Sequence, residues 1–278
     1  MASVTAAQPL AQIKDTIVLA GAGKMGGAML TGWLAGGLDP RRVAVIEPHP
    51  SADITALAAK GISLNPSAKE IGDVGTLVVA VKPQMFREAG PALKQFVGPS
   101  TLVVSIMAGA PIAALTQVCG GSVVRAMPNT PAAIGRGITV AVAANNVSPA
   151  QRAVADALLR ATGSVEWVDD ENLMDAVTAV SGSGPAYIFL LAEELARAGV
   201  EAGLPAELAT RLARETVAGS GELLHRSDDS SATLRKNVTS PGGTTAAALE
   251  VLMAPDGMQP LMIRAVAAAT KRSKELAK

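Results

Sequence analysis

Hydrophobic residues in the first half of the chain come in short runs rich in Val, Ile and Ala, with few polar residues inside them. Such runs are typical of strands that are covered on both faces of a sheet. They lie at residues 16–20, 43–46, 76–81, 101–106, 122–127, 138–144 and 164–168. Stretches with helical spacing separate them at residues 25–35, 54–60, 112–118 and 149–161. This alternation predicts a doubly wound, mostly parallel α/β sheet.

The strand pattern stops after Asp169, and helical spacing follows at residues 173–180, 185–202, 206–224, 244–252 and 258–276. We therefore predict a flexible leader at residues 1–14, an α/β domain at 15–169 and an all-α domain at 170–278. The helix at 185–202 is apolar on nearly all sides, which predicts burial around most of its circumference. A domain of about 110 residues does not bury such a helix easily on its own.

The overall composition narrows the choice of partners. Among the 278 residues, Lys and Arg number 24 and Asp and Glu also number 24, so the formal net charge is zero. No basic stretch accumulates, which argues against nucleic acid or an anionic membrane as partner. No apolar run reaches the roughly 18 residues needed to cross a bilayer. The mean hydropathy of +0.32 indicates that apolar surface is buried between subunits.

Cysteine and histidine are scarce. Cys119 is the single cysteine and has no partner in the chain, which suits a reducing cytoplasm. Residues 1–14 lack the charged start and compact apolar stretch of a signal peptide. We predict no metal site. The two histidines, His49 and His225, do not indicate a strong general acid, and His225 is interpreted as a surface residue near a helix end.

A glycine pattern follows the first predicted strand. Gly21, Gly23 and Gly26 have the G-x-G-x-x-G spacing between a strand and a helix. The first glycine allows a tight turn, the second lets the backbone approach a pyrophosphate, and the third lets the helix pack on the strand. The helix N-terminus then offers unpaired N–H groups to the phosphates. The alternative is a Gly-rich turn without a ligand.

The second predicted strand ends at Glu47. An acidic residue there accepts hydrogen bonds from the adenosine ribose and repels a 2′-phosphate. This predicts a preference for NADH over NADPH, and Arg41 and Arg42 precede the strand, where they are badly placed to hold a phosphate. The alternative is an exposed loop carboxylate, because the spacing from Gly21 is longer than the usual value of about 20 residues.

Two further strand tips are candidates for the wall of the cofactor site. Lys82-Pro83 ends one strand and Ala108-Gly109 ends the next. Ligands of open parallel sheets lie beyond the carboxyl ends of the strands. A solvated lysine and an ordinary turn are the alternatives.

Five sequence blocks together resemble pyrroline-5-carboxylate reductases. They are "GAGKMG" at 21–26, "AVKP" at 80–83, "RAMPNTP" at 125–131, "DAVTAVSGSGPAY" at 175–187 and "VTSPGGTT" at 238–245. The resemblance implies an N-terminal Rossmann domain and a C-terminal helical domain for substrate binding and dimerisation. It also implies a homodimer, or a larger ring such as a decamer. The implied reaction is hydride transfer from NAD(P)H to the C=N carbon of 1-pyrroline-5-carboxylate, which gives L-proline and ends proline biosynthesis.

The resemblance also implies which residues contact the cofactor. They are Gly21, Ala22, Gly23, Lys24, Met25, Gly26, Ser67, Ala80, Val81, Lys82, Pro83, Met107, Ala108, Glu171 and Asn237. The chain departs from the family at Glu47, where members commonly carry a small hydroxyl or polar residue that helps to bind the 2′-phosphate. The cofactor is therefore NADP(H) or NAD(H), and Glu47 favours NADH.

The block at 238–245 interrupts the helical half with a Pro-Gly-Gly break among hydroxyl residues. Gly242 and Gly243 bring backbone N–H groups close to a carboxylate, because no Cβ intervenes. The helix that starts at Thr244 adds its unpaired first turn, and a Thr there can cap it. Thr245 resembles the family residue whose hydroxyl meets the ring nitrogen, and Ser240 adds a hydrogen bond. The alternative is a capped helix without a ligand.

The remaining polar residues have open roles. Arg125 binds substrate or forms a structural ion pair, and we favour the ion pair. Tyr187 packs or contacts substrate. Catalysis then depends on orienting the hydride donor and acceptor.

Two rival functions remain. A β-hydroxyacid dehydrogenase shares the two-domain plan, but such enzymes place a catalytic Lys on the long helix, and residues 185–202 contain none. A silent NAD-binding regulator has no need of a second ligand pocket at 238–245.

Overall fold

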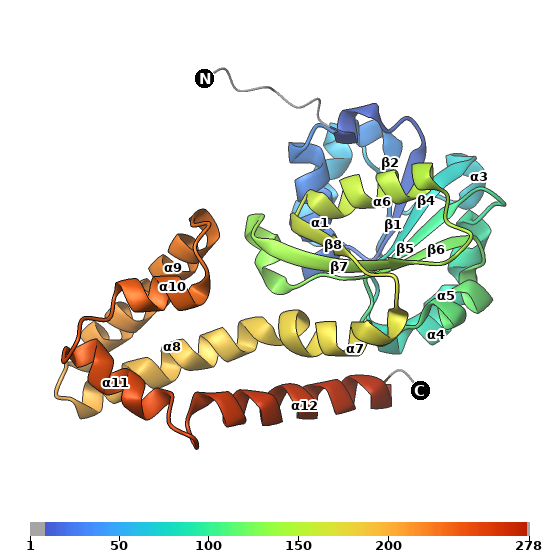
Figure 1. Ribbon diagram of the computed structural model, residues 1–278. Coiled ribbons are helices and arrows are strands. Elements are labelled where there is room, and N and C mark those ends of the chain that lie inside the picture. Colours follow the sequence, from blue (N-terminus) through green and yellow to red (C-terminus); the bar gives the residue numbers. More distant parts are fainter. Residues whose placement is uncertain (1–8, 277–278) are drawn as a thin grey trace. The chain divides into compact units, whose positions relative to one another are not determined.

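The computed structural model describes residues 9–276 and contains two compact units (Figure 1). Among the described residues, the first comprises 9–182 with 270–276, and the second comprises Ser183–Ala269. The predicted boundary after residue 169 stays a prediction. Residues 1–8 of the predicted leader lie outside the described part. Pro9–Gln12 form a 3-10 helix, and Leu10 is buried in the core, so this part of the leader is not loose as predicted.

The first unit is built on an eight-stranded sheet with the order β3-β2-β1-β4-β5-β6-β7-β8. All neighbouring strands are parallel except β6 and β7, which confirms the mostly parallel fold. The strands are β1 (Thr16–Ala20), β2 (Val43–Ile46), β3 (Ser63–Leu64), β4 (Val74–Val79), β5 (Leu102–Ser105), β6 (Ser122–Met127), β7 (Gly137–Ala143) and β8 (Gly163–Trp167).

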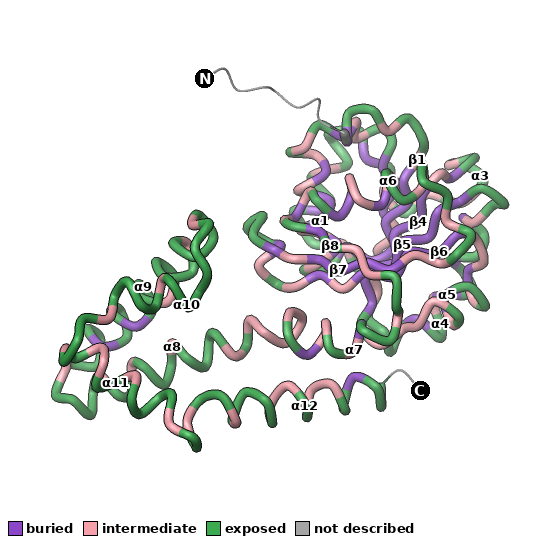
Figure 2. Tube along the Cα trace, in the orientation of Figure 1, coloured by how far each residue is buried: buried purple, intermediate pink, exposed green. Residues whose placement is uncertain are grey.

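Helices cover both faces of this sheet. They are α1 (Lys24–Ala35), α2 (Ala52–Leu57), α3 (Ala68–Ile71), α4 (Pro83–Leu93), α5 (Ile112–Cys119) and α6 (Pro149–Arg160). One core contains Trp33 and Leu158, and the Trp33 indole N–H donates to the Leu158 carbonyl at 2.8 Å. The other contains Phe86 and Leu115. Figure 2 shows the buried residues concentrated along the strands, because strands covered on both faces bury every side chain.

The second unit is entirely helical within the described residues. It holds α8 (Gly184–Glu201), α9 (Ala206–Arg226), α10 (Ser231–Asn237), α11 (Thr244–Leu252) and most of α12 (Met258–Leu276). In the first unit, α7 (Met174–Val177) continues into a π-helical turn, Thr178–Gly182. The C-terminal end of α12 returns to the first unit, where the Ser273 hydroxyl donates to Asp175 Oδ1 at 2.6 Å.

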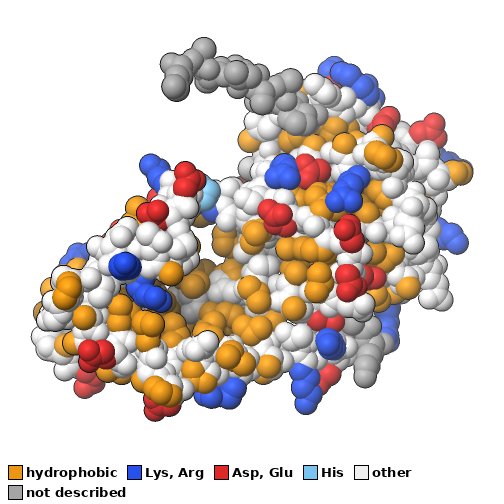
Figure 3. Space-filling view, viewed as in Figure 1, with side chains coloured by type: hydrophobic (Ala, Val, Ile, Leu, Met, Phe, Trp, Pro, Cys, Tyr) orange, Lys and Arg blue, Asp and Glu red, His pale blue; other side chains and the backbone are white. Residues whose placement is uncertain are grey.

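The prediction that the helix at 185–202 is buried is wrong for the single chain. No residue of α8 is buried. Its exposed hydrophobic residues are Ile188, Phe189, Leu190, Leu191, Leu195 and Val200. Figure 3 shows hydrophobic side chains gathered at the surface of the second unit. This is the surface expected of a helix that a second chain covers. No helix in the described residues is long and apolar enough to cross a bilayer.

Candidate active site

The glycine loop between β1 and α1 has the geometry of a nucleotide cradle. Gly21 has φ +92°, and its N–H donates to the Ile46 carbonyl at 2.9 Å. A Cβ on Gly21 would lie 2.7 Å from the Ala80 carbonyl oxygen, and one on Gly26 would overlap the Gly21 carbonyl. A Cβ on Gly23 would meet nothing within 4 Å. Packing therefore explains Gly21 and Gly26, whereas the open space at Gly23 is where a ligand would approach the backbone.

The start of α1 is suited to an anion. Gly23 is the N-cap, and no side chain caps the helix. The first-turn N–H groups, which begin at Lys24 and Met25, are thus left for a ligand at the positive end of the helix dipole.

Glu47 lies beside this loop. Its Oε2 accepts from the Ala22 N–H at 2.9 Å, and its Oε1 accepts from the His49 N–H at 3.1 Å. The side chain is half-buried, unlike the exposed loop carboxylate of the alternative interpretation. A negative charge is therefore fixed at the end of β2, next to the cradle.

Two more predicted segments meet at the same edge of the sheet. The Ala80 N–H donates to the Ala20 carbonyl at 2.8 Å, and the Ile106 N–H donates to the Val79 carbonyl at 3.0 Å. These bonds place the segments 80–83 and 107–108 at the carboxyl ends of neighbouring strands, and Ala80 and Val81 lie against Gly21 of the glycine loop. The Met107 side chain is buried in the core, so only its backbone is free to contact a ligand.

Ser67 is the N-cap of α3 in the first unit. Its N–H and its hydroxyl both donate to Glu70 Oε2, each at 2.7 Å. The Ser67 backbone N–H, followed by its hydroxyl, lowers the pKa of Glu70. The Ser67 hydroxyl is therefore engaged in a capping box in this structure, and its contact with the adenosine stays a prediction.

Arg125 forms an ion pair with Glu171, which confirms the structural interpretation of this arginine. Arg125 Nη1 lies 2.9 Å from Glu171 Oε1, and the same oxygen accepts from the Ile112 N–H at 2.8 Å. The Arg125 side chain is 7% exposed. The pair ties β6 to the start of α5, directly after the segment at 107–108, and a cofactor contact of Glu171 stays a prediction.

The loop at 238–245 lies within the second unit and forms a tight turn. The Gly243 N–H donates to the Ser240 carbonyl at 3.1 Å, and Gly242 has φ +68°. Pro241 and Gly242 thus occupy the positions that a type II turn favours for Pro and Gly. A Cβ on Gly243 would lie 2.5 Å from Ser240 Oγ, so a larger residue there would displace the Ser240 hydroxyl.

This turn corrects two details of the sequence interpretation. The Gly243 N–H bonds within the turn and is not free for a carboxylate. No threonine caps α11, because its N-cap is Gly243 and no side chain bonds there. The first turn, which begins with Thr244 and the half-buried Thr245, therefore remains without a side-chain cap and open to an anion. Asn237 ends α10, immediately before this loop.

The structure thus groups the predicted residues in two places. The glycine loop, Glu47 and the segments 80–83 and 107–108 meet in the first unit, and Ser240, Gly242, Gly243, Thr244 and Thr245 meet in the second. In the described residues, no group of three or more His, Cys, Asp or Glu side chains has an arrangement that holds a metal ion.

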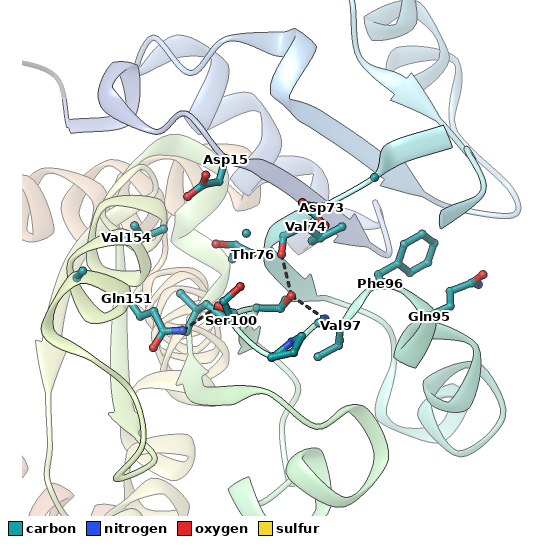
Figure 4. Close-up of a pocket in the computed structure, with 17 residues that line it drawn as sticks. Asp15, Asp73, Val74, Thr76, Gln95, Phe96, Val97, Ser100, Gln151 and Val154 are labelled. Atoms are coloured by element: carbon teal, nitrogen blue, oxygen red, sulfur yellow. Dashed lines mark hydrogen bonds between the residues drawn. The ribbon is translucent and has the colours of Figure 1, made fainter. Parts of the chain in front are cut away.

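A separate cavity of about 620 Å³ lies at the opposite edge of the sheet (Figure 4). Residues around the amino ends of β1, β4 and β5 line it, among them Asp15, Asp73 and Thr101. The Thr101 hydroxyl donates to the Val74 carbonyl at 2.7 Å and accepts from the Gly98 N–H at 2.9 Å. Ligands of such sheets lie at the carboxyl ends, so this cavity is separate from the candidate nucleotide site.

Comparison with protein families gives two matches. The family described as "Pyrroline-5-carboxylate reductase dimerisation" matches residues 171–276. The family described as "NADP oxidoreductase coenzyme F420-dependent" matches residues 16–109. The first match covers the helical region and the second covers the glycine loop and the neighbouring strands.

Individual proteins are similar over nearly the whole chain. The pyrroline-5-carboxylate reductase of Pseudomonas aeruginosa is 40% identical over 264 residues, which are 94% of this chain and 96% of that protein. The solved structure of a pyrroline-5-carboxylate reductase from Coxiella burnetii has a TM-score of 0.87 and 34% identity, covering 96% of this chain and 100% of that chain. The Plasmodium falciparum pyrroline carboxylate reductase with NADP bound has a TM-score of 0.77 and 30% identity, covering 95% and 99% of the two chains.

Proposed function

The chain belongs to the pyrroline-5-carboxylate reductase family, and we propose that it reduces the C=N bond of 1-pyrroline-5-carboxylate to give L-proline, the final step of proline biosynthesis. It is an oxidoreductase that acts on an imine with a nicotinamide cofactor. The observation that carries this proposal is the family likeness along almost the whole chain, which includes both the nucleotide loop and the loop at 238–245.

The residues at the carboxyl edge of the sheet fit a dinucleotide. Open space lies at Gly23, α1 begins without a side-chain cap, and Glu47 holds a carboxylate beside the loop. We assign the pyrophosphate to the first turn of α1 and the ribose to Glu47, with the segments 80–83 and 107–108 as the wall beyond them. When bound, the dinucleotide supplies the hydride.

The loop at 238–245 is the proposed substrate site. The first-turn N–H groups of α11 hold the substrate carboxylate, because they carry the positive end of the helix dipole. Ser240 adds a hydroxyl, and the Thr245 hydroxyl meets the ring nitrogen. A hydroxyl is suitable because it both donates and accepts as the imine becomes an amine. These residues orient the acceptor carbon, which lowers the barrier without a strong general acid.

We propose that the enzyme prefers NADH. A 2′-phosphate carries a charge of about −2 at neutral pH and would face the fixed Glu47 carboxylate. Arg41 is a cation close to Glu47 in the sequence, but it pairs with Asp39. The hydrogen bond from the Arg41 side chain lowers the pKa of the Asp39 carboxyl to about 2. The repulsion is therefore not offset by this arginine.

Self-association follows from the dimerisation family match and the uncovered apolar face of α8. We propose a homodimer through this face, and a larger ring such as a decamer built from dimers. The family likeness and the single cysteine, which suits a reducing compartment, support a place in the cytoplasm.

A steady-state assay tests the function directly. The purified protein is supplied with 1-pyrroline-5-carboxylate and either NADH or NADPH, and the loss of nicotinamide absorbance is followed. We expect turnover with both cofactors and a higher kcat/KM with NADH. Absence of turnover with either cofactor would remove the reductase proposal.

A variant in the second unit tests the placement of the substrate. Thr245→Ala should raise KM or lower kcat for the imine by about tenfold, while the Kd for NADH stays nearly unchanged. Equal damage to NADH binding would contradict the assignment of Thr245 to the substrate.

A further inference from the structure

The end of β2 is held by a side chain in place of a neighbouring strand. The parallel pairing of β3 with β2 continues through the Asn65 N–H, which donates to the Val45 carbonyl at 2.7 Å. The chain then turns away, since Asn65 has φ +51° and is the one non-glycine residue with a positive φ in the described range 9–276. Asparagine tolerates this left-handed conformation better than most side chains do.

The Asn65 carboxamide then replaces the next peptide group of the sheet. Its Oδ1 accepts from the Glu47 N–H at 2.8 Å, and its Nδ2 donates to the Glu47 carbonyl at 2.9 Å. Both backbone polar groups of Glu47 are therefore paired with one side chain. A carboxamide is suited to this role because it carries a donor and an acceptor on one rigid plane.

The side chain of Glu47 has two hydrogen bonds of its own. The N–H groups of Ala22 and His49 each donate to one of its carboxylate oxygens. A carboxylate has about four acceptor sites, so about two remain for the hydroxyl groups of a ribose. The direction of these remaining sites depends on where the backbone of Glu47 lies, and Asn65 bonds both polar groups of that backbone.

Building on the proposed function, we propose that Asn65 is a positioning residue for dinucleotide choice: it holds Glu47 where the carboxylate accepts from the ribose of NADH and repels the 2′-phosphate of NADPH. Asn65 acts through Glu47 and need not touch the cofactor. Loss of its two hydrogen bonds lets the end of β2 shift, which weakens the ribose contact and relieves the repulsion.

The test is a double-mutant cycle that measures cofactor binding without substrate. The Kd values of NADH and NADPH are obtained by nicotinamide fluorescence titration for the parent protein, Asn65→Gly, Glu47→Ser and the double variant. Glycine adopts φ +51° freely, so Asn65→Gly removes the carboxamide without backbone strain. Asn146→Gly, at an exposed asparagine that bonds the Gly121 carbonyl, is the matched control, and thermal melting shows that each variant is folded.

We expect Asn65→Gly to reduce the preference for NADH over NADPH by about fivefold and Glu47→Ser to reduce it by about tenfold. In the Glu47→Ser background, Asn65→Gly should change the ratio by less than about twofold, because its effect is transmitted by Glu47. Asn146→Gly should leave the ratio unchanged.

Each other outcome has a distinct meaning. If Asn65→Gly weakens both cofactors equally, or shifts the ratio as much without Glu47, the positioning role is wrong. If Glu47→Ser does not shift the ratio, the role of Glu47 and the inference about Asn65 both fall. If the parent protein binds cofactor but does not reduce the imine, the proposed function fails and the binding ratios still decide the role of Asn65.

Discussion

Loss of the Glu171 carboxylate should destabilise the first unit through the charge that it leaves behind. Arg125 is 7% exposed and Glu171 is 32% exposed at the side chain. Glu171→Ala removes the acceptor of both the Arg125 guanidinium and the Ile112 N–H. Breaking a fully buried pair costs about 3–5 kcal/mol, because the remaining charge is buried without a partner. Glu171 is partly solvated, so we expect a loss of about 2 kcal/mol.

A substitution of Arg125 distinguishes the cost of an unpaired buried charge from the cost of lost packing. Arg125→Met fills similar space without a charge, so the double variant Arg125→Met/Glu171→Ala should recover to within about 1 kcal/mol of the parent protein. Urea unfolding at fixed protein concentration measures both changes. The two tryptophans, Trp33 and Trp167, both lie in the first unit, so their fluorescence reports on this unit. A double variant as unstable as Glu171→Ala would refute the argument from buried charge.

Three further predictions concern other parts of the chain. Gly243→Ala puts a methyl group 2.5 Å from Ser240 Oγ and should lower kcat/KM for the imine about tenfold, whereas Gly98→Ala, whose Cβ meets only Thr101 Oγ1 at 3.7 Å, should leave it unchanged. Burial raises the pKa of the Cys119 thiol, so a thiol reagent at about pH 8 should label this residue in urea but not in the folded protein. Phe189→Asp, at a side chain that is 67% exposed in the single chain, should produce a monomer in light scattering and a lower melting temperature; an unchanged dimer would show that this part of α8 lies outside the interface.

The central strands were predictable from the sequence because their burial has a simple pattern. The residues predicted at 16–20, 43–46 and 122–127 are the observed bounds of β1, β2 and β6. The strand predicted at 76–81 is β4, Val74–Val79, which begins and ends earlier. Its apolar run continues through Val81, and only the pairing with neighbouring strands decides where the ladder ends.

Helix α4 was not among the predicted helices, although its two prolines are compatible with a helix. Pro83 is its first residue, where a missing N–H has no cost, and Pro91 lies inside it. The buried residues Phe86, Gly90 and Leu93 repeat at helical spacing, so the signal was present. The two-residue strand β3 is too short to show a pattern of its own.

In the candidate site too, features encoded by neighbouring residues could be predicted, whereas features that depend on distant residues could not. The glycine loop was recognisable because its spacing encodes a local turn. The hydrogen bonds from the Asn65 side chain to the backbone of Glu47 could not be recognised in the sequence. Asn65 lies 18 residues away, and it reaches Glu47 through its positive φ and the register of β3 on β2. Likewise, the sequence suggested a capping threonine at α11, whereas the N-cap is Gly243, which packs against the Ser240 hydroxyl.

The helical unit cannot owe its stability to its own core. Of the buried hydrophobic residues, those from Ser183–Ala269 are Ala209 and Ala213, both small. Two alanines bury far too little apolar area to offset the conformational entropy lost by so many ordered residues. The dimerisation family match points to self-association, and we expect the missing burial to come from a second chain that covers the exposed leucine, isoleucine, phenylalanine and valine side chains of α8. For the proposed homodimer, we therefore expect folding of this unit and association to be one equilibrium, so that the loop at 238–245, which lies within the unit, is stabilised by assembly.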